Sequence, residues 1–251
     1  MTALPLAGVS VAITRPSDQA KKLASCIEAA GGHVILFPLI AIVPLDDYSE
    51  FEATIANIAC FDWVIFISSN AVQHGMPFLL KQKLPNTLQF AAIGPVTANE
   101  LQNFGIKKVT IPEGRFDSES LLSLPSMQDM QGKKVMIVRG VGGREVLAET
   151  LQSRGADVTF AECYQRINPQ QNVEALTTAW SNHQLQAIVV TSSEAMRYFL
   201  DLAIDAAWLK DVTICVNHAR IAEQPIQLGL KVLIADAPGD EAMLNTLLRA
   251  H

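Results

Sequence analysis

The sequence is poor in cysteine, histidine and aromatic residues, and none of them falls in a metal-binding pattern. Of 251 residues, four are cysteine, five are histidine and 6% are aromatic. The cysteines stand singly without C-x-x-C spacing, and the histidines form no H-x-x-x-H or H-E-x-x-H pattern. We therefore expect reduced thiols in a cytoplasmic protein and no metal site.

Long apolar runs and an excess of positive charge are absent as well. No run of 18 or more apolar residues suggests a membrane span, and the N-terminus lacks the basic and apolar regions of a signal peptide. The net charge of −6 gives no sign of nucleic-acid binding. We expect neither a membrane nor a nucleic-acid partner. With 49% hydrophobic residues, the chain is long enough for one large or two ordinary globular domains.

What the sequence does contain is an internal repeat at an offset of 124 residues. The segment "DWVIFISSNA" matches "QAIVVTSSEA", which places Ser192 at 124 positions after Ser68 (192 − 68 = 124). At the same offset "GVSVAITRP" matches "GKKVMIVRG", and Gly31 aligns with Gly155. A constant offset over several landmarks favours a duplicated unit over the strand–turn–helix texture that all α/β proteins share.

Each copy alternates short apolar segments with amphipathic helical ones. The expected strands lie near 9–14, 34–37, 62–67, 89–93 and 107–111, and near 134–138, 157–161, 187–191, 212–216 and 230–234. Strands that alternate with helices predict parallel sheets covered on both faces. Five strands per copy fit a flavodoxin-like, doubly wound order, so the expected fold class is α/β with two such sheets.

Two extended, proline-bearing stretches near 37–47 and 161–169 interrupt this rhythm at equivalent places of the repeat. We interpret them as crossings between domains. One domain is then discontinuous and consists of residues 1–37 plus 166–251. The other consists of residues 40–163.

Hydroxyl, glycine and arginine residues follow nearly every expected strand. In open α/β sheets ligands bind beyond the carboxyl ends of the strands, against helix N-termini. Exposed N–H groups, hydroxyls and guanidinium groups suit carboxylates or phosphates. The alternative for each of these strand–helix turns, called corners below, is that its Ser, Thr or Asn only caps a helix. The candidate binding residues are Thr14, Arg15, Ser68, Ser69, Asn70, Gly94, Thr97, Arg139, Arg144, Thr191, Ser192, Ser193, His218 and Arg220.

Two of these corners invite other interpretations that their spacing does not support. "RGVGGRE" follows a strand and opens a helix, but it lacks both the G-x-x-x-x-G-K-[ST] and the full G-x-G-x-x-G spacing of nucleotide-binding loops. "ISSNA" is not the G-x-S-x-G elbow of a serine hydrolase.

In order and spacing together, several segments resemble the uroporphyrinogen-III synthase (HemD) family over essentially the full chain. They are "ITRP", "FPLIAI", "DWVIFISSNAV", "AIGPVTANEL", "VMIVRGVGGREVLAETLQSRGADV", "CYQR" and "IVVTSSEAM". The resemblance implies two flavodoxin-like domains joined by a two-stranded linker. One segment departs from the family: "VNHARIAEQ" stands where a Ser- or Thr-rich turn is common, which weakens the transfer of a binding role to His218 and Arg220.

The resemblance further implies a hydro-lyase. Hydroxymethylbilane, held between the domains, would lose water and close with inversion of ring D through a spiro intermediate, giving uroporphyrinogen III. No cofactor or metal would be needed. Tyr164, in the family's Y-x-R/T segment, would be the candidate acid, and the alternative is a linker aromatic that packs against a domain. The chain would act as a monomer and could take its substrate from the preceding pathway enzyme. The alternative is a non-catalytic two-domain module that binds an anionic small molecule.

Overall fold

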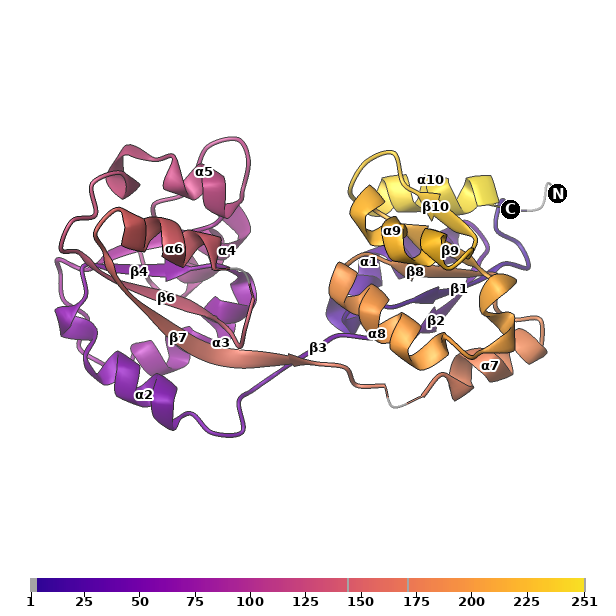
Figure 1. Cartoon of the computed structure of the whole chain (residues 1–251), viewed down its shortest axis with the longest axis horizontal. Helices are drawn as coiled ribbons and strands as arrows, with labels where there is room; N and C mark the ends of the chain where they lie inside the picture. Colours follow the sequence, from indigo (N-terminus) through magenta and orange to yellow (C-terminus); the bar gives the residue numbers. More distant parts are fainter. Residues whose placement is uncertain (1–3, 144, 171, 251) are drawn as a thin grey trace. The chain divides into compact units, whose positions relative to one another are not determined.

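The computed structural model describes residues 4–143, 145–170 and 172–250 (Figure 1). Contacts divide the chain at Ala41/Ile42 and at Arg166/Ile167. The two ends of the chain form unit 1, and Ile42–Arg166 form unit 2. The sequence places the two crossings near 37–47 and 161–169, and both division points lie within these ranges.

Unit 1 is built on a five-stranded sheet with the order β10-β9-β8-β1-β2. Its strands are β1 (Ser10–Ile13), β2 (His33–Leu36), β8 (Ala187–Val190), β9 (Thr213–Val216) and β10 (Val232–Ile234). Neighbouring strands run parallel throughout. Taken in chain order the arrangement is 2-1-3-4-5, which is the flavodoxin-like order. Figure 1 shows β1 and β2 beside β8 and β9, although 150 residues (37–186) lie between β2 and β8 in the chain.

Two apolar cores cover the two faces of this sheet. Helices α1 (Ser17–Ala29) and α10 (Asp240–Ala250) bury Leu23, Ile27 and Leu247 on one face. The other face is covered by α7 (Glu174–Ser181), α8 (Ser193–Ala203), η3 (Ala207–Lys210) and α9 (Ala219–Gln227). Since both faces are covered, β1 and β8 are buried along their whole length, as apolar runs without alternation predict.

Unit 2 has a second five-stranded sheet with the order β3-β7-β6-β4-β5. Its strands are β3 (Ala41–Val43), β4 (Trp63–Phe66), β5 (Gln89–Ala92), β6 (Lys134–Gly140) and β7 (Asp157–Ile167). Strands β7, β6, β4 and β5 pair in parallel. In both units, therefore, the first strand–helix–strand of one copy of the repeat joins the later strands of the other copy.

Helices also cover both faces of the unit 2 sheet. One face carries α2 (Ser49–Ala56), η1 (Ile58–Cys60), α3 (Ser69–Leu79) and α4 (Pro95–Asn103). The other carries α5 (Ser118–Leu122), η2 (Pro125–Met127) and α6 (Val146–Ser153).

The strand expected near 107–111 is wrong as a full strand. Only Thr110 forms a bridge to the sheet, through its N–H to Phe90 O and its carbonyl to Ala92 N. Exposed lysines precede Thr110, and Pro112, two residues later, has no N–H to extend the ladder. Within the described residues, no helix is both long and apolar enough to cross a membrane.

Candidate functional site

The carboxyl edge of the unit 2 sheet contains a pocket of about 380 Å³. The segments after β4, β5 and β6 and the first turns of α5 and α6 form its walls. Its lining is Ile67, Ile93, Asp117, Ser118, Glu119, Ile137, Arg139, Gly142, Gly143, Val146, Leu147, Ala148, Phe160 and Arg166. Its described charged groups are Arg139, Arg166 and the carboxylates of Asp117 and Glu119, and Asp117 caps α5 by accepting the Ser120 N–H at 2.8 Å. Apolar walls with two arginines suit a ligand that carries carboxylates on apolar rings.

Arg139 is the most deeply buried charge of this pocket, with 2% of its surface exposed. It lies near the end of β6, and its Nε donates to the Gly140 carbonyl at 3.1 Å. The guanidinium lies over the Phe160 ring at 4.5 Å and pairs with Glu162 at 3.8 Å. Glu162 also accepts the Gly142 N–H at 3.0 Å, so one carboxylate holds both the arginine and the loop that follows it.

Tyr164 lies on β7, and 1% of its surface is exposed. Its hydroxyl is 3.2 Å from the Ser68 hydroxyl, and Arg166 Nη2 donates to it at 3.4 Å. Because side chains alternate along a strand, Tyr164 and Arg166 belong to the same face of β7. The ring of His74, whose pKa burial lowers, lies 5.6 Å from the Tyr164 ring.

The two serines of the repeat both cap helices, as the simpler interpretation predicts. Ser68 Oγ accepts the Ala71 N–H at 3.0 Å, and Ser192 Oγ accepts the Ala195 N–H at 3.0 Å. Only the first of these caps has a tyrosine hydroxyl beside it among the described residues. Ser69 and Asn70 follow in the first turn of α3, and Ser193 begins α8 and is exposed.

Gly94 precedes α4 at the end of β5. A Cβ at this position would lie 2.9 Å from Phe116 Cβ, so the glycine lets the loop before α5 approach the strand end. Thr97 lies in the first turn of α4 and is 6% exposed. Arg144 lies outside the described residues, and its predicted binding role stays a prediction.

In unit 1 the predicted residues form contacts of their own. The Thr14 hydroxyl donates to the Val189 carbonyl at 2.9 Å and is buried. Arg15 Nε donates to the Thr191 hydroxyl at 3.1 Å, and Arg15 Nη1 pairs with Asp240 at 2.5 Å. The arginine therefore joins the ends of β1 and β8 to the first turn of α10.

The end of β9 leads into α9 through His218, which is exposed and occupies the capping position without a side-chain cap. Arg220 is exposed in the first turn of α9. Between strand and helix, the buried Asn217 Oδ1 has no hydrogen-bond partner among the described residues. The repeat aligns His218 with Gly94, and the two corners differ in burial as well as in sequence.

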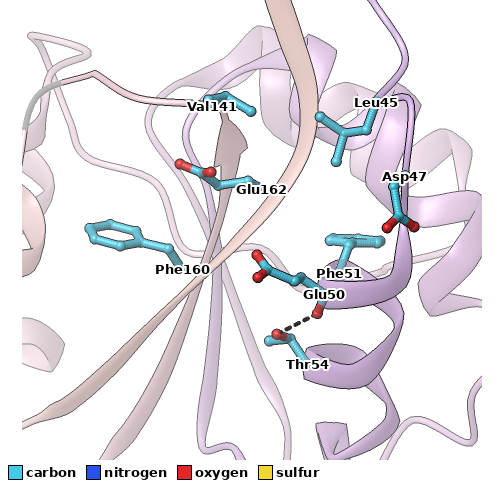
Figure 2. Close-up of a pocket in the computed structure, with 8 residues that line it drawn as sticks. All are labelled: Leu45, Asp47, Glu50, Phe51, Thr54, Val141, Phe160 and Glu162. Atoms are coloured by element: carbon cyan, nitrogen blue, oxygen red, sulfur yellow. Dashed lines mark hydrogen bonds between the residues drawn. The ribbon is translucent and has the colours of Figure 1, made fainter.

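A larger pocket of about 580 Å³ lies beside the first one in unit 2 and shares Phe160 with it (Figure 2). Among the described residues its charged lining consists of Asp47, Glu50 and Glu162. Figure 2 shows Asp47 and Glu50 on the side of α2 and Glu162 on the side of the sheet. Among the described residues this lining has three carboxylates and no basic side chain, which repels an anionic ligand. The smaller pocket has two arginines beside its two carboxylates, so it fits a polycarboxylate better.

Arg166, Glu162 and Phe160 belong to the site but are not among the residues that the sequence predicts. The alternation of side chains along β7 indicates Arg166, since it lies two positions after Tyr164. Glu162 is also two positions from Tyr164, but its contact with Gly142 depends on the pairing of β7 with β6. Among the described residues, no group of three or more His, Cys, Asp or Glu side chains could hold a metal ion.

Two solved structures share this fold over nearly the whole chain. A mutant uroporphyrinogen III synthase of Thermus thermophilus has a TM-score of 0.65 at 18% identity, covering 96% of this chain and 98% of its own. The uroporphyrinogen-III synthetase of Helicobacter pylori has a TM-score of 0.63 at 17% identity, covering 97% and 100%. At these identities the likeness concerns the fold.

Sequence relatives are closer. Uroporphyrinogen-III synthase from Escherichia coli is 32% identical over 245 residues, covering 95% of this chain and all of its own. The enzyme from Proteus mirabilis is 36% identical over 194 residues, covering 76% and 98%. The family model described as uroporphyrinogen-III synthase HemD matches residues 21–245. This chain therefore belongs to the uroporphyrinogen-III synthase (HemD) family.

Proposed function

We propose that this chain converts hydroxymethylbilane to uroporphyrinogen III. The linear tetrapyrrole, which carries an acetate and a propionate on each ring, loses water and closes with inversion of the last ring through a spiro intermediate. In reaction class this is a hydro-lyase. Membership of the family supports the proposal, and the chemistry of the 380 Å³ pocket agrees with it.

The observation that carries the proposal is a pocket with apolar walls and two arginines, one of which, Arg166, donates to the buried Tyr164 hydroxyl at 3.4 Å. Ile67, Ile137 and Phe160 suit pyrrole rings, and Arg139 and Arg166 suit their carboxylate arms. The pocket accommodates part of the substrate, and the predicted residues of unit 1 stay predictions of further substrate contact.

Catalysis in this proposal is mainly positioning. The substrate is flexible, and unassisted closure gives the isomer without inversion. A site that fixes the last ring in the inverted orientation lowers the entropic part of the barrier. In this proposal the Asp117 and Glu119 carboxylates of the lining stabilise the cation that forms when the hydroxyl departs. Tyr164 is the candidate source of the proton that this departure requires.

The test is to supply hydroxymethylbilane and to separate the product isomers by chromatography. We expect uroporphyrinogen III to dominate when the protein is present. Formation of the non-inverted type I isomer alone, at the rate seen in buffer, would refute the proposal and would favour the non-catalytic binding module.

We further propose that the chain acts as a cytoplasmic monomer that receives its substrate from the preceding pathway enzyme. The instability of the substrate toward unassisted closure supports a direct transfer. Sedimentation of the protein tests the first statement, and a stable dimer contradicts it. The isomer yield of the reaction coupled to that enzyme tests the second, and a yield that dilution leaves unchanged contradicts it.

A further inference from the structure

Tyr164, the candidate acid, is buried by side chains of unit 2 itself. Its ring packs against Gly140, where a Cβ would come within 2.5 Å of Cε2, and 1% of the residue is exposed. Arg139 is similarly buried but lines the 380 Å³ pocket, whereas Tyr164 does not, so a substrate in that pocket does not touch the phenol directly. Ser68, whose hydroxyl is 3.2 Å from the phenol oxygen, is partly exposed and directly follows Ile67, which lines the pocket.

The hydrogen bonds around this hydroxyl pair restrict where its two protons can be. Arg166 is only a donor, so at the Tyr164 oxygen it occupies a lone pair and cannot accept the phenol proton. Among the described residues the remaining partner for that proton is Ser68 Oγ. The Ser68 oxygen already accepts the Ala71 N–H, and with its second lone pair it can accept the phenol as well. The serine's own proton then has no partner in this cluster and is free for a ligand.

We propose that Ser68 is the catalytic residue that gives a proton to the departing hydroxyl of the substrate, and that Tyr164 replenishes it. This inference rests on the proposed function and names the proton route within it. As the carbon–oxygen bond breaks, its electron pair leaves with the oxygen, which takes the Ser68 proton and departs as water. Ser68 takes the Tyr164 proton in the same step, and the Arg166 guanidinium faces the resulting phenolate. The proton lost from carbon after ring closure returns along the same path.

The competing account is that Ser68 only caps α3. The repeat supplies the comparison, because Ser192 caps α8 with the same 3.0 Å bond. Ser192→Ala therefore measures what the loss of such a cap does to the melting temperature. Ser68→Asn keeps a capping oxygen but has no hydroxyl, whereas Ser68→Thr keeps both.

The experiment measures single-turnover rates of uroporphyrinogen III formation and KM for the wild-type protein, Ser68→Asn, Ser68→Ala, Ser68→Thr, Tyr164→Phe and the double variant Ser68→Asn/Tyr164→Phe. We expect Ser68→Asn to lower the rate about 10²-fold, within the range for general acids, with KM hardly changed. Tyr164→Phe should lower the rate comparably, and Ser68→Thr should retain most of it. The double variant should be no slower than the slower single variant. In mixtures of light and heavy water, a plot of the wild-type rate against the deuterium fraction should be curved. Such curvature indicates that two protons are transferred in the rate-limiting step.

Three results would overturn the proposal. A nearly wild-type rate in Ser68→Asn with a slow Tyr164→Phe would make the phenol the direct donor. If the rate of the double variant fell by the product of the two single-variant factors, Ser68 and Tyr164 would act independently. Ser68 would act only as the cap of α3 under the following results. Ser68→Ala would lose rate and melt at a lower temperature than Ser192→Ala, and Ser68→Asn would keep full activity. A failure of the proposed function is distinguishable, since the wild-type protein would then form type I product alone.

Discussion

Arg139 keeps its guanidinium out of water, so the groups around it decide how strongly it attracts a carboxylate. Glu162 neutralises part of its charge at 3.8 Å, and 38% of the Glu162 side chain is exposed, so solvent screens the pair. We expect Glu162→Gln, which keeps an oxygen for the Gly142 N–H, to lower KM for the substrate. A screened pair contributes about 0.5–1 kcal/mol, which corresponds to roughly two- to fivefold in KM.

The matched control for this change is Glu50→Gln. It removes the same charge from the 580 Å³ pocket, where no described contact joins Glu50 to an arginine. Steady-state kinetics give KM for both variants and show whether the pairing of Glu162 with Arg139 governs substrate binding. If Glu162→Gln raises KM, or if both variants change it equally, the local pairing with Arg139 does not govern substrate binding.

The four thiols should differ sharply in reactivity. Burial raises the pKa of both Cys163 and Cys215 from 9.0 to about 12, and Glu162 adds to the effect at Cys163. The thiolate is the reactive form, so at pH 8 a disulfide reagent should label exposed Cys60 quickly, Cys26 more slowly, and the buried pair after denaturation. Mass spectrometry of the labelled peptides checks this order. Fast labelling of Cys163 in the native protein would contradict the packing around β7.

The same pKa values predict a dependence of stability on pH. In the unfolded chain the two buried thiols ionise near their ordinary pKa of 9.0, whereas in the folded protein they keep their protons until about pH 12. The folded state then binds more protons above pH 9, so the unfolding free energy falls as the pH rises from 9 toward 12. Urea unfolding of the double variant Cys163→Ala/Cys215→Ala, compared with the wild-type protein, should show a smaller fall over this window.

At the scale of single residues, the sequence shows which side chains follow a strand but not what they bind. Arg15 and Arg139 are both predicted as carboxylate ligands for the same reason. The structure pairs Arg15 with Asp240, 225 positions later, and Arg139 with Glu162. Such partners depend on sheet order and strand register, which no local pattern contains.

Strand β6 ends on a glycine because the Tyr164 ring lies against it. A Cβ on Gly140 would come within 2.5 Å of Cε2 and 2.6 Å of Cζ of that ring, which is buried and cannot move away freely. We expect Gly140→Ala to cost about 1–3 kcal/mol of unfolding free energy, as overpacked cores do. It should also slow turnover by displacing the phenol from Ser68.

The control for this substitution is Gly75→Ala in helix α3 of the same unit. There the nearest contact of a new Cβ is one methyl group of Val138 at 3.0 Å, and alanine gains about 1 kcal/mol of helix propensity over glycine. Urea denaturation should show Gly140→Ala as clearly the less stable variant. Equal stabilities would show that the Tyr164 ring has room to shift.

The whole molecule was more predictable than its site. The offset of 124 residues indicated two similar sheets, and the extended stretches indicated that the chain crosses twice. The expected strand at 107–111 failed for local reasons, because it begins with two exposed lysines and is followed by Pro112, although Val109 and Ile111 pack against the core. Core strands are specified by many apolar residues at once, whereas an edge depends on a few backbone bonds.

Each unit should fold on its own core, and unit 2 is the one that is continuous in the chain. Its two apolar clusters draw all their buried members from between Phe51 and Tyr164, and none from unit 1. We therefore expect the excised fragment of residues 42–166 to fold cooperatively, with a urea transition and the far-ultraviolet circular dichroism of an α/β protein. The fragment of residues 1–41 is the control. It contains β1 and β2 but lacks β8, the other neighbour of β1, and it should stay unfolded because a two-stranded fragment buries too little apolar surface. An unfolded or non-cooperative 42–166 fragment would mean that the stability of unit 2 depends on unit 1.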